Sequence, residues 1–113
     1  MTERLDFNRY QDFTDTTAIY PNSASDPIYP TLGLTGEAGE VAEKLKKHLR
    51  AGGGPLPAAI KDDMILELGD VLYYLARVAR ACDVTLEEVA ARNVAKLTDR
   101  RERGRLQGDG DHR

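Results

Sequence analysis

The sequence predicts an all-α fold, a four-helix bundle, on two observations. Four segments place apolar residues at the three- and four-residue spacing of an amphipathic helix, and they account for most of the 113 residues. Sustained alternation of apolar and polar residues is absent, and so is the Asn-Gly pair that marks a tight hairpin. We therefore expect a single domain over residues 1–113, with a core drawn from the 41% of residues that are hydrophobic.

The first two expected helices are bounded by common helix signals. The first begins after Asp6, an N-cap residue type, and ends at about Tyr20, because Pro21 follows. Residues 21–30 are rich in Asn, Ser, Asp and Pro, which predicts a loop. The second helix covers roughly residues 31–51 and stops at three consecutive glycines, after a basic last turn that suits the negative end of the helix dipole.

The third and fourth expected helices follow a connection that contains glycine and proline. The third covers about residues 57–83 and is the most apolar part of the chain. The fourth begins at Thr85, which forms with Glu88 the pattern of a capping box, and it continues to about Glu102. The tail, residues 104–113, contains three glycines among charged residues, a composition that by itself is typical of disorder.

Charge and cysteine content narrow the function classes. Sixteen basic and 19 acidic residues give a net charge of −3, which offers no broad attraction to a nucleic-acid backbone. The single cysteine, Cys82, excludes an intramolecular disulfide and a multi-cysteine zinc site, and we expect it in the core. The first residues are charged, and no apolar run is long enough to cross a membrane. We expect a cytoplasmic protein that binds neither membranes nor nucleic-acid polymers.

Acidic residues recur at the same place on the two central helices. On a helical wheel Glu37 lies at the edge of an apolar stripe, and Glu40 lies one turn further on. Glu67 and Asp70 repeat this arrangement on the next helix. The two stripes are formed by Leu34, Ala38, Val41, Leu45 and Leu49, and by Met64, Leu68, Val71, Leu75, Val78 and Cys82. If the helices pack through these stripes, four carboxyl groups meet at the rim of the core.

Four carboxylates in one place repel each other and resist desolvation, and a divalent cation removes that conflict. Oxygen ligands without a nearby His or Cys favour Mg²⁺ or Mn²⁺ over Zn²⁺, and Mg²⁺ commonly shares its coordination with substrate phosphates. A single acidic pair three residues apart is, however, more often a solvated helix face. The residue pattern alone therefore leaves a metal site and a solvated surface as equal alternatives.

Residues 33–41 and 67–75 resemble the two signature helices of the MazG-like all-α nucleoside triphosphate pyrophosphatases. That family carries E-x-x-E, a spacer and then E-x-x-D, and the spacer here has 26 residues. Asn93, Lys96 and Arg100 match the family's N-x-x-K and the arginine that follows it. The similarity extends further to Tyr10-Gln11, to Tyr29-Pro30 and to residues 103–113. The resemblance thus covers nearly the whole chain.

This resemblance implies an activity and a set of site residues. The implied reaction is the hydrolysis of nucleoside or deoxynucleoside triphosphates to the monophosphate and pyrophosphate, as in the house-cleaning of nucleotide pools. The implied metal is Mg²⁺, with Mn²⁺ as a substitute. The carboxylates implied as metal ligands and catalytic residues are Glu37, Glu40, Glu67 and Asp70. The residues implied as substrate contacts are Asn93, Lys96, Lys47 and Arg100.

Several neighbouring residues have two interpretations. Glu43 is either an extra ligand or base, or a surface residue. Lys44 and Lys47 lie on the Glu40 side of the helix and either contact phosphate or balance charge, and Lys47 is preferred for the phosphate contact. Lys96 is either a phosphate contact or an ordinary solvated lysine. Tyr73 and Tyr74 are candidates for stacking on a base, but aromatic residues in so apolar a helix usually serve packing.

Two further expectations concern assembly and the tail. The third helix carries apolar or aromatic groups around much of its circumference, so one partner helix cannot cover it and a homo-oligomer is expected. The resemblance implies a homodimer or homotetramer with sites near the subunit interface. It also implies that the tail is ordered in part, folded over a neighbouring surface or over the site.

Other interpretations compete with hydrolysis. A non-catalytic helical bundle that binds partners, or a module that senses nucleotides, would serve interaction rather than chemistry. A di-iron carboxylate bundle needs E-x-x-H motifs, which His48 and His112 do not supply. The preferred base and sugar stay open, because their discrimination depends on the shape of a pocket built from several helices.

Overall fold

The computed structural model describes residues 4–104, 108 and 110–111, and these residues form helices, turns and loops without a strand. The helices are α1 (Phe7–Asp15), α2 (Ile28–Arg50), α3 (Ala58–Ala81) and α4 (Leu86–Glu102). The prediction of an all-α chain with four helices is thereby confirmed. Within this part of the chain, no helix combines the length and the apolar character needed to cross a membrane.

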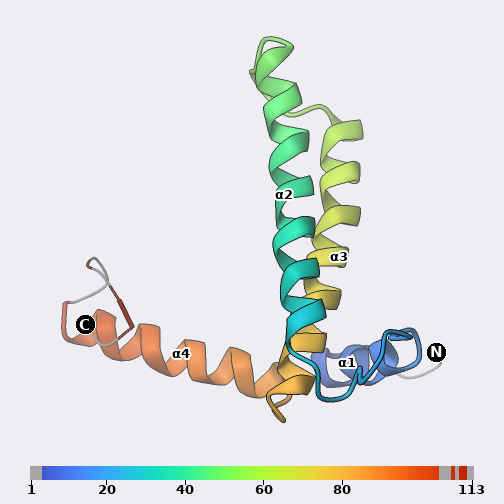
Figure 1. Ribbon diagram of the computed structural model, residues 1–113. Coiled ribbons are helices and arrows are strands. Elements are labelled where there is room, and N and C mark those ends of the chain that lie inside the picture. The colour runs from blue at the N-terminus through green and yellow to red at the C-terminus, as the bar shows by residue number, and fades with distance from the viewer. Residues whose placement is uncertain (1–3, 105–107, 109, 112–113) are drawn as a thin grey trace.

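The four helices do not close into a bundle within one chain. Figure 1 shows α2 and α3 side by side as a long antiparallel hairpin, with α1 lying at its base. Helix α4 leaves the same base in another direction and points away from the hairpin. It contacts α1 and α3, but α2 and α4 do not meet. The expected bundle is therefore corrected to a hairpin with α4 projecting from its base.

Helix α1 starts where the sequence predicts and ends earlier. The Asp6 carboxylate caps it by accepting a hydrogen bond from the Arg9 backbone N–H at 2.8 Å. The helix ends at Asp15, well before the predicted end, because threonines follow it. The Phe13 carbonyl accepts from the Thr16 backbone N–H at 2.9 Å and from the Thr16 hydroxyl at 2.7 Å, while the Thr17 N–H, which would continue the helix, donates to Thr14 instead.

Helix α2 begins earlier than predicted and ends as predicted. The Asp26 carboxylate accepts a hydrogen bond from the Ile28 backbone N–H at 2.9 Å, which satisfies a free donor of the first turn. Pro30 is compatible with that turn, where a backbone N–H has no partner within the helix. The glycines at 52–54 have φ values of 119°, 70° and 84°, a left-handed region that glycine enters without strain. They turn the chain back into α3.

The best-buried part of the chain lies where α1, α3 and α4 meet. Its buried apolar residues are Ala76, Ala79 and Leu86. Gln11 is buried with them: its amide group donates to the Val84 carbonyl at 3.0 Å, and its side-chain oxygen accepts from the Leu86 N–H at 3.0 Å. Gln11 therefore satisfies the backbone of the turn that leads into α4.

A buried guanidinium ties the loop after α1 to the same base. The Arg77 side chain is 1% exposed and forms an ion pair with Asp15. It also donates to the Tyr20 hydroxyl at 3.3 Å and to the Ser23 carbonyl at 2.7 Å. Because a buried charge is costly without partners, these contacts hold the end of α1 and the loop at Tyr20 and Ser23 against α3.

The two predicted apolar stripes are covered unevenly. Their half-buried members are Leu34, Val41, Met64, Val71 and Val78. Their exposed members are Ala38, Leu45, Leu49, Leu68, Leu75 and Cys82. The expectation of Cys82 in the core is wrong, because α3 ends at Ala81 and the next side chain leaves the packed face. One chain thus covers about half of each stripe.

Candidate metal centre

Three carboxylates come together where α2 and α3 face each other. One oxygen from each of Glu37, Glu67 and Asp70 lies within 4.8 Å of the others. Glu67 and Asp70 are three residues apart, so they share one side of α3, and the antiparallel hairpin places Glu37 opposite them. The helical period that predicted the approach of two acidic helices accounts for three of the four carboxylates.

The electrostatics of this cluster favour a cation. Burial, together with the neighbouring carboxylates of Asp70 and Glu67, raises the pKa of Glu37 above its ordinary range. Burial makes the largest contribution to this rise in pKa, and the neighbouring carboxylates add negative charge that is not fully offset. The donors are all oxygens and are close enough to contact one ion together, and hard divalent cations such as Mg²⁺ prefer oxygen ligands. The residues therefore fit a divalent metal.

The other acidic residues of α2 lie further out. Glu40 is exposed and is not among the three close carboxylates, although its charge contributes to the raised pKa of Glu37. Glu43 forms an ion pair with Lys46 at 2.6 Å, and this contact lowers the pKa of Glu43. Of the two interpretations of Glu43, the ion pair favours the surface residue.

Lys44 is the lysine of α2 that lies beside the carboxylates. Its Nζ is 4.0 Å from Glu67 Oε1, and its side chain is 30% exposed. Lys47, the lysine preferred from the sequence, is exposed and lies almost one turn further along the helix. A role of Lys47 in substrate binding stays a prediction, and the structure adds Lys44 as a neighbour of the centre.

An aromatic cluster covers the lower part of the hairpin. Tyr20 stacks on Tyr29 with ring centroids 4.5 Å apart, and Tyr73 meets Tyr74 edge-on at 5.2 Å. A Cβ added to Gly33 would lie 2.5 Å from the Tyr74 ring, so glycine at this position lets the ring rest against the α2 backbone. These contacts favour the packing interpretation of Tyr73 and Tyr74.

Tyr10 is a neighbour of the three carboxylates that the residue pattern of the acidic helices did not identify. Its hydroxyl lies 3.5 Å from the Gly69 carbonyl oxygen, beside Asp70. Burial, with contributions from Tyr73 and Asp70, raises the pKa of Tyr10. In the sequence it stood out only through the similarity of Tyr10-Gln11 to the family, because α1 gives no sign of which helix it crosses.

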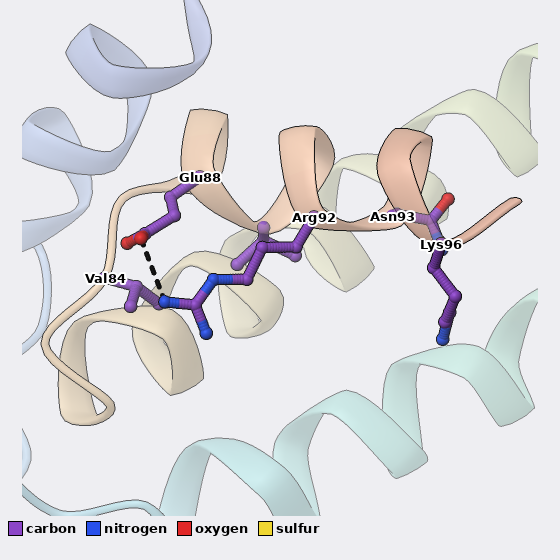
Figure 2. A pocket seen from close by; sticks show the side chains of 6 residues that line it. Val84, Glu88, Arg92, Asn93 and Lys96 are labelled. Atoms are coloured by element: carbon purple, nitrogen blue, oxygen red, sulfur yellow. Dashed lines mark hydrogen bonds and ion pairs between the residues drawn. The ribbon is translucent and has the colours of Figure 1, made fainter. Parts of the chain in front are cut away.

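Two of the three predicted substrate contacts of α4, Asn93 and Lys96, line a pocket on that helix, and Arg100 is not among its lining residues. Figure 2 shows Asn93 and Lys96 at one end of the pocket, and Arg92 paired with Glu88 at 2.9 Å at the other. Helix α4 points away from the middle of the hairpin (Figure 1), where the three carboxylates lie. One chain therefore does not bring Asn93 and Lys96 to its own carboxylates.

The described part of the tail lies against α4. Lys96 Nζ is 3.0 Å from Asp111 Oδ1. Arg100 lies 3.5 Å from the same oxygen and donates to the Gly110 carbonyl at 3.2 Å, and its side chain is 4% exposed. Both predicted phosphate-binding cations of α4 thus contact the tail. The tail residues Arg105, Leu106, Gln107, Asp109, His112 and Arg113 lie outside the described part of the chain, so the expected order of the whole tail stays a prediction.

Comparison with known proteins agrees with the residue pattern. Residues 29–104 match the MazG nucleotide pyrophosphohydrolase domain, and this segment contains the acidic positions of both α2 and α3. The chain is 47% identical over 109 residues to the Gene 37 protein of Mycobacterium phage L5, an alignment that covers 92% of this chain and 96% of that protein. No solved structure matches the chain. The chain belongs to the MazG nucleotide pyrophosphohydrolase domain family.

Proposed function

We propose that this protein hydrolyses nucleoside or deoxynucleoside triphosphates to the monophosphate and pyrophosphate in a Mg²⁺-dependent reaction. The observation that carries the proposal is the approach of Glu37, Glu67 and Asp70 to within 4.8 Å in a chain of the MazG family. Glu40, exposed beside them on α2, is assigned as the fourth ligand. Mn²⁺ is expected to substitute, because it accepts the same oxygen ligands. House-cleaning of nucleotide pools is the role that fits this activity.

The reaction joins a water oxygen to the α-phosphorus and breaks the bond between that phosphorus and the oxygen that bridges to the β-phosphorus. Pyrophosphate leaves with the bridging oxygen, and a proton of the water passes to a carboxylate of the centre. A divalent metal on these carboxylates would supply positive charge to the phosphates and a more acidic water. The chain's own task is to hold four oxygen donors in place, which the packing of α2 on α3 accomplishes for three of them.

The polar residues of α4 are assigned to the triphosphate. Lys96 and Arg100 offer positive charge, and Asn93 offers an amide on the same side of the helix. Because α4 points away from the hairpin of its own chain, we assign these contacts to the α4 of a second copy. Lys47 remains a candidate for a further phosphate contact.

Assembly into a homodimer or homotetramer is part of the same proposal. Large apolar side chains on α3 and α4 are exposed in a single chain: Leu66 by 72%, Leu68 by 52%, Val94 by 65% and Leu97 by 42%. Apolar surface on this scale in so small a domain is typical of a subunit interface. Burial of these side chains would also fix the direction of α4, because α4 meets the other helices of its own chain near its start.

The test is pyrophosphate release from a panel of nucleoside and deoxynucleoside triphosphates, with and without Mg²⁺. Asp70→Asn is expected to lower the rate by at least about 100-fold, because it removes a ligand of the centre. The matched control is Asp63→Asn, two turns earlier on α3 and exposed. Circular dichroism checks that both variants keep their helices. A wild-type protein that releases no pyrophosphate, and whose thermal stability is indifferent to Mg²⁺, would favour the interaction-protein alternative.

A further inference from the structure

The centre has a cation from its own chain. Lys44 follows Glu37 by seven residues, about two helical turns, so the two side chains share one face of α2. From this face Lys44 reaches across to α3, where its Nζ lies 4.0 Å from Glu67 Oε1. The side chains of this pair are 30% and 21% exposed, which makes it a partly enclosed pair rather than a pair in free solvent.

The neighbouring lysines of α2 make different contacts. Lys46 pairs with Glu43 at 2.6 Å, and its side chain is 58% exposed. Lys47 is also exposed. The half-buried position of Lys44 is therefore not a general property of the basic end of α2, and it calls for an explanation in terms of the carboxylates nearby.

One ammonium does not balance the carboxylates that it faces. Glu37, Glu67 and Asp70 gather within 4.8 Å, and Lys44 pairs with Glu67 at 4.0 Å, longer than the 2.7–2.9 Å typical of a tight charged hydrogen bond. Such a contact attracts the ammonium without locking it. Lysine is suited to movement, because it carries a compact charge on a flexible four-carbon stem.

We propose that Lys44 is a positioning residue with two states: it is the counter-ion of Glu67 when the metal is absent, and it turns to the triphosphate when the carboxylates hold the metal. The second state rests on the proposed function. A divalent ion held by Glu67 would compete for the carboxylate that attracts the ammonium and would repel the ammonium, and the phosphates of a bound nucleotide would then offer it an anionic partner. This assigns to Lys44 the phosphate contact for which the sequence favoured Lys47.

Two binding measurements by calorimetry on the full-length protein test the proposal. The probes are Mg²⁺ alone and inorganic tripolyphosphate at saturating Mg²⁺. Lys44→Met is expected to bind Mg²⁺ at least about threefold more tightly, because no ammonium has to be displaced. The same variant is expected to bind tripolyphosphate about tenfold more weakly, because a charged donor is lost.

Three further variants guard the interpretation. Lys44→Arg keeps the charge and is expected to recover most of the tripolyphosphate affinity. Lys44→Gln is a second neutral variant in case the methionine variant does not fold, which thermal unfolding in EDTA reveals. Lys46→Met removes a lysine of the same helix that pairs outside the centre, and it should resemble the wild type in both measurements.

The opposite signs of the two changes are the signature of the two states. An unchanged affinity for tripolyphosphate would overturn the second state, and an unchanged affinity for Mg²⁺ would overturn the first. Pyrophosphate release, measured in parallel, separates this inference from the proposed function. A wild type that releases no pyrophosphate, combined with both shifts in Lys44→Met, would contradict the reaction and keep the assignment of Lys44.

Discussion

The α2–α3 hairpin and helix α4 differ in how much of their surface packs against other parts of the same chain. The hairpin packs helix against helix along its length, and it gathers carboxylates from both sides (Figure 1). Helix α4 is anchored near its start, where Leu86 is buried, while Val94 and Leu97 further on are 65% and 42% exposed. Three of the proposed metal ligands gather within one chain, whereas the cations that we propose for the triphosphate lie apart from them.

The difference follows from what holds each part in place. The two acidic helices are joined by a short connection, residues 51–57, so the chain itself brings them face to face. The direction of α4 depends on a small junction around Ala76, Ala79 and Gln11. Because α4 meets the other helices of its own chain near its start, another surface is needed to fix the rest of it, and we assign that surface to a second copy.

The largest expected effect that separates the two regions is complementation between inactive variants. Asp70→Asn removes a proposed metal ligand on the hairpin, and Lys96→Glu reverses a charge on α4. Each variant is expected to lower the rate of pyrophosphate release by about 100-fold. If α4 of one subunit completes the site on the hairpin of the other, a mixed dimer combines one intact hairpin with one intact α4 and keeps one intact site. Joint refolding of equal amounts should then restore about a quarter of the wild-type rate, since half of the dimers are mixed.

The control for this experiment mixes two variants of the hairpin. Asp70→Asn with Glu37→Gln leaves no chain with an intact set of carboxylates, so no recovery is expected. A mixture of Asp70→Asn and Lys96→Glu that is no more active than its parents would contradict the assignment of Lys96 to the partner's site.

The second prediction concerns the apolar surface through which α4 is expected to contact a second subunit. Leu97→Asp places a charge on an apolar position that we expect to be buried in the oligomer, and should weaken subunit association by at least about 100-fold. Sedimentation velocity would show a shift to the monomer, with loss of pyrophosphate release. Ala95→Asp, two residues away and on the other side of the helix, is the matched control. A wild type that sediments as a monomer would contradict the assembly itself.

Much of the fold could be predicted because its signals are local. Asp6 and Thr85 cap α1 and α4 through their side chains as predicted, with Thr85 accepting from the Glu88 N–H at 3.0 Å. The second half of the expected capping box differs, because the Glu88 carboxylate accepts from Arg92 at 2.9 Å. The direction of α4 was not predictable, since helical periodicity describes faces and not the angle between distant helices.

Some residues of the candidate site could likewise be predicted from the sequence, and others could not. The helical period placed Glu37, Glu67 and Asp70 on facing sides of two helices before any packing was known. It could not choose between the lysines of α2, because that choice depends on which side chain reaches across to α3. Nor could it find Arg77, whose buried ion pair exists only because α1 crosses the base of the hairpin.

The third prediction tests the excess charge of the hairpin without any substrate. Burial, with Asp70 and Glu67 beside it, raises the pKa of Glu37, so in the absence of metal the folded protein binds this proton more readily than the unfolded chain. That contribution to stability is complete below the ordinary glutamate pKa, and it is lost as the pH rises through the raised value.

Urea unfolding in EDTA across this pH window measures the effect. The free energy of unfolding of the wild type should fall with rising pH relative to Glu37→Gln, which has no titrating group at this position. Mg²⁺ should favour the wild type increasingly as the pH rises, because it binds the deprotonated carboxylate. A difference that grows in favour of the wild type with rising pH in EDTA would contradict the raised pKa.

The smallest expected effect lies at the far end of α4. The Asp111 carboxylate lies 3.0 Å from the Lys96 ammonium, which we assign to the triphosphate, so the two anions compete for this cation. Asp111→Asn should lower KM about twofold without changing kcat, because an exposed ion pair competes only weakly with a substrate. Asp99→Asn is the control, since it breaks the 2.8 Å pair with Arg103, the C-cap residue of α4, and leaves Lys96 untouched. A rise in KM for Asp111→Asn alone would mean that the tail helps to bind the substrate, and α4 would then supply the site together with its tail.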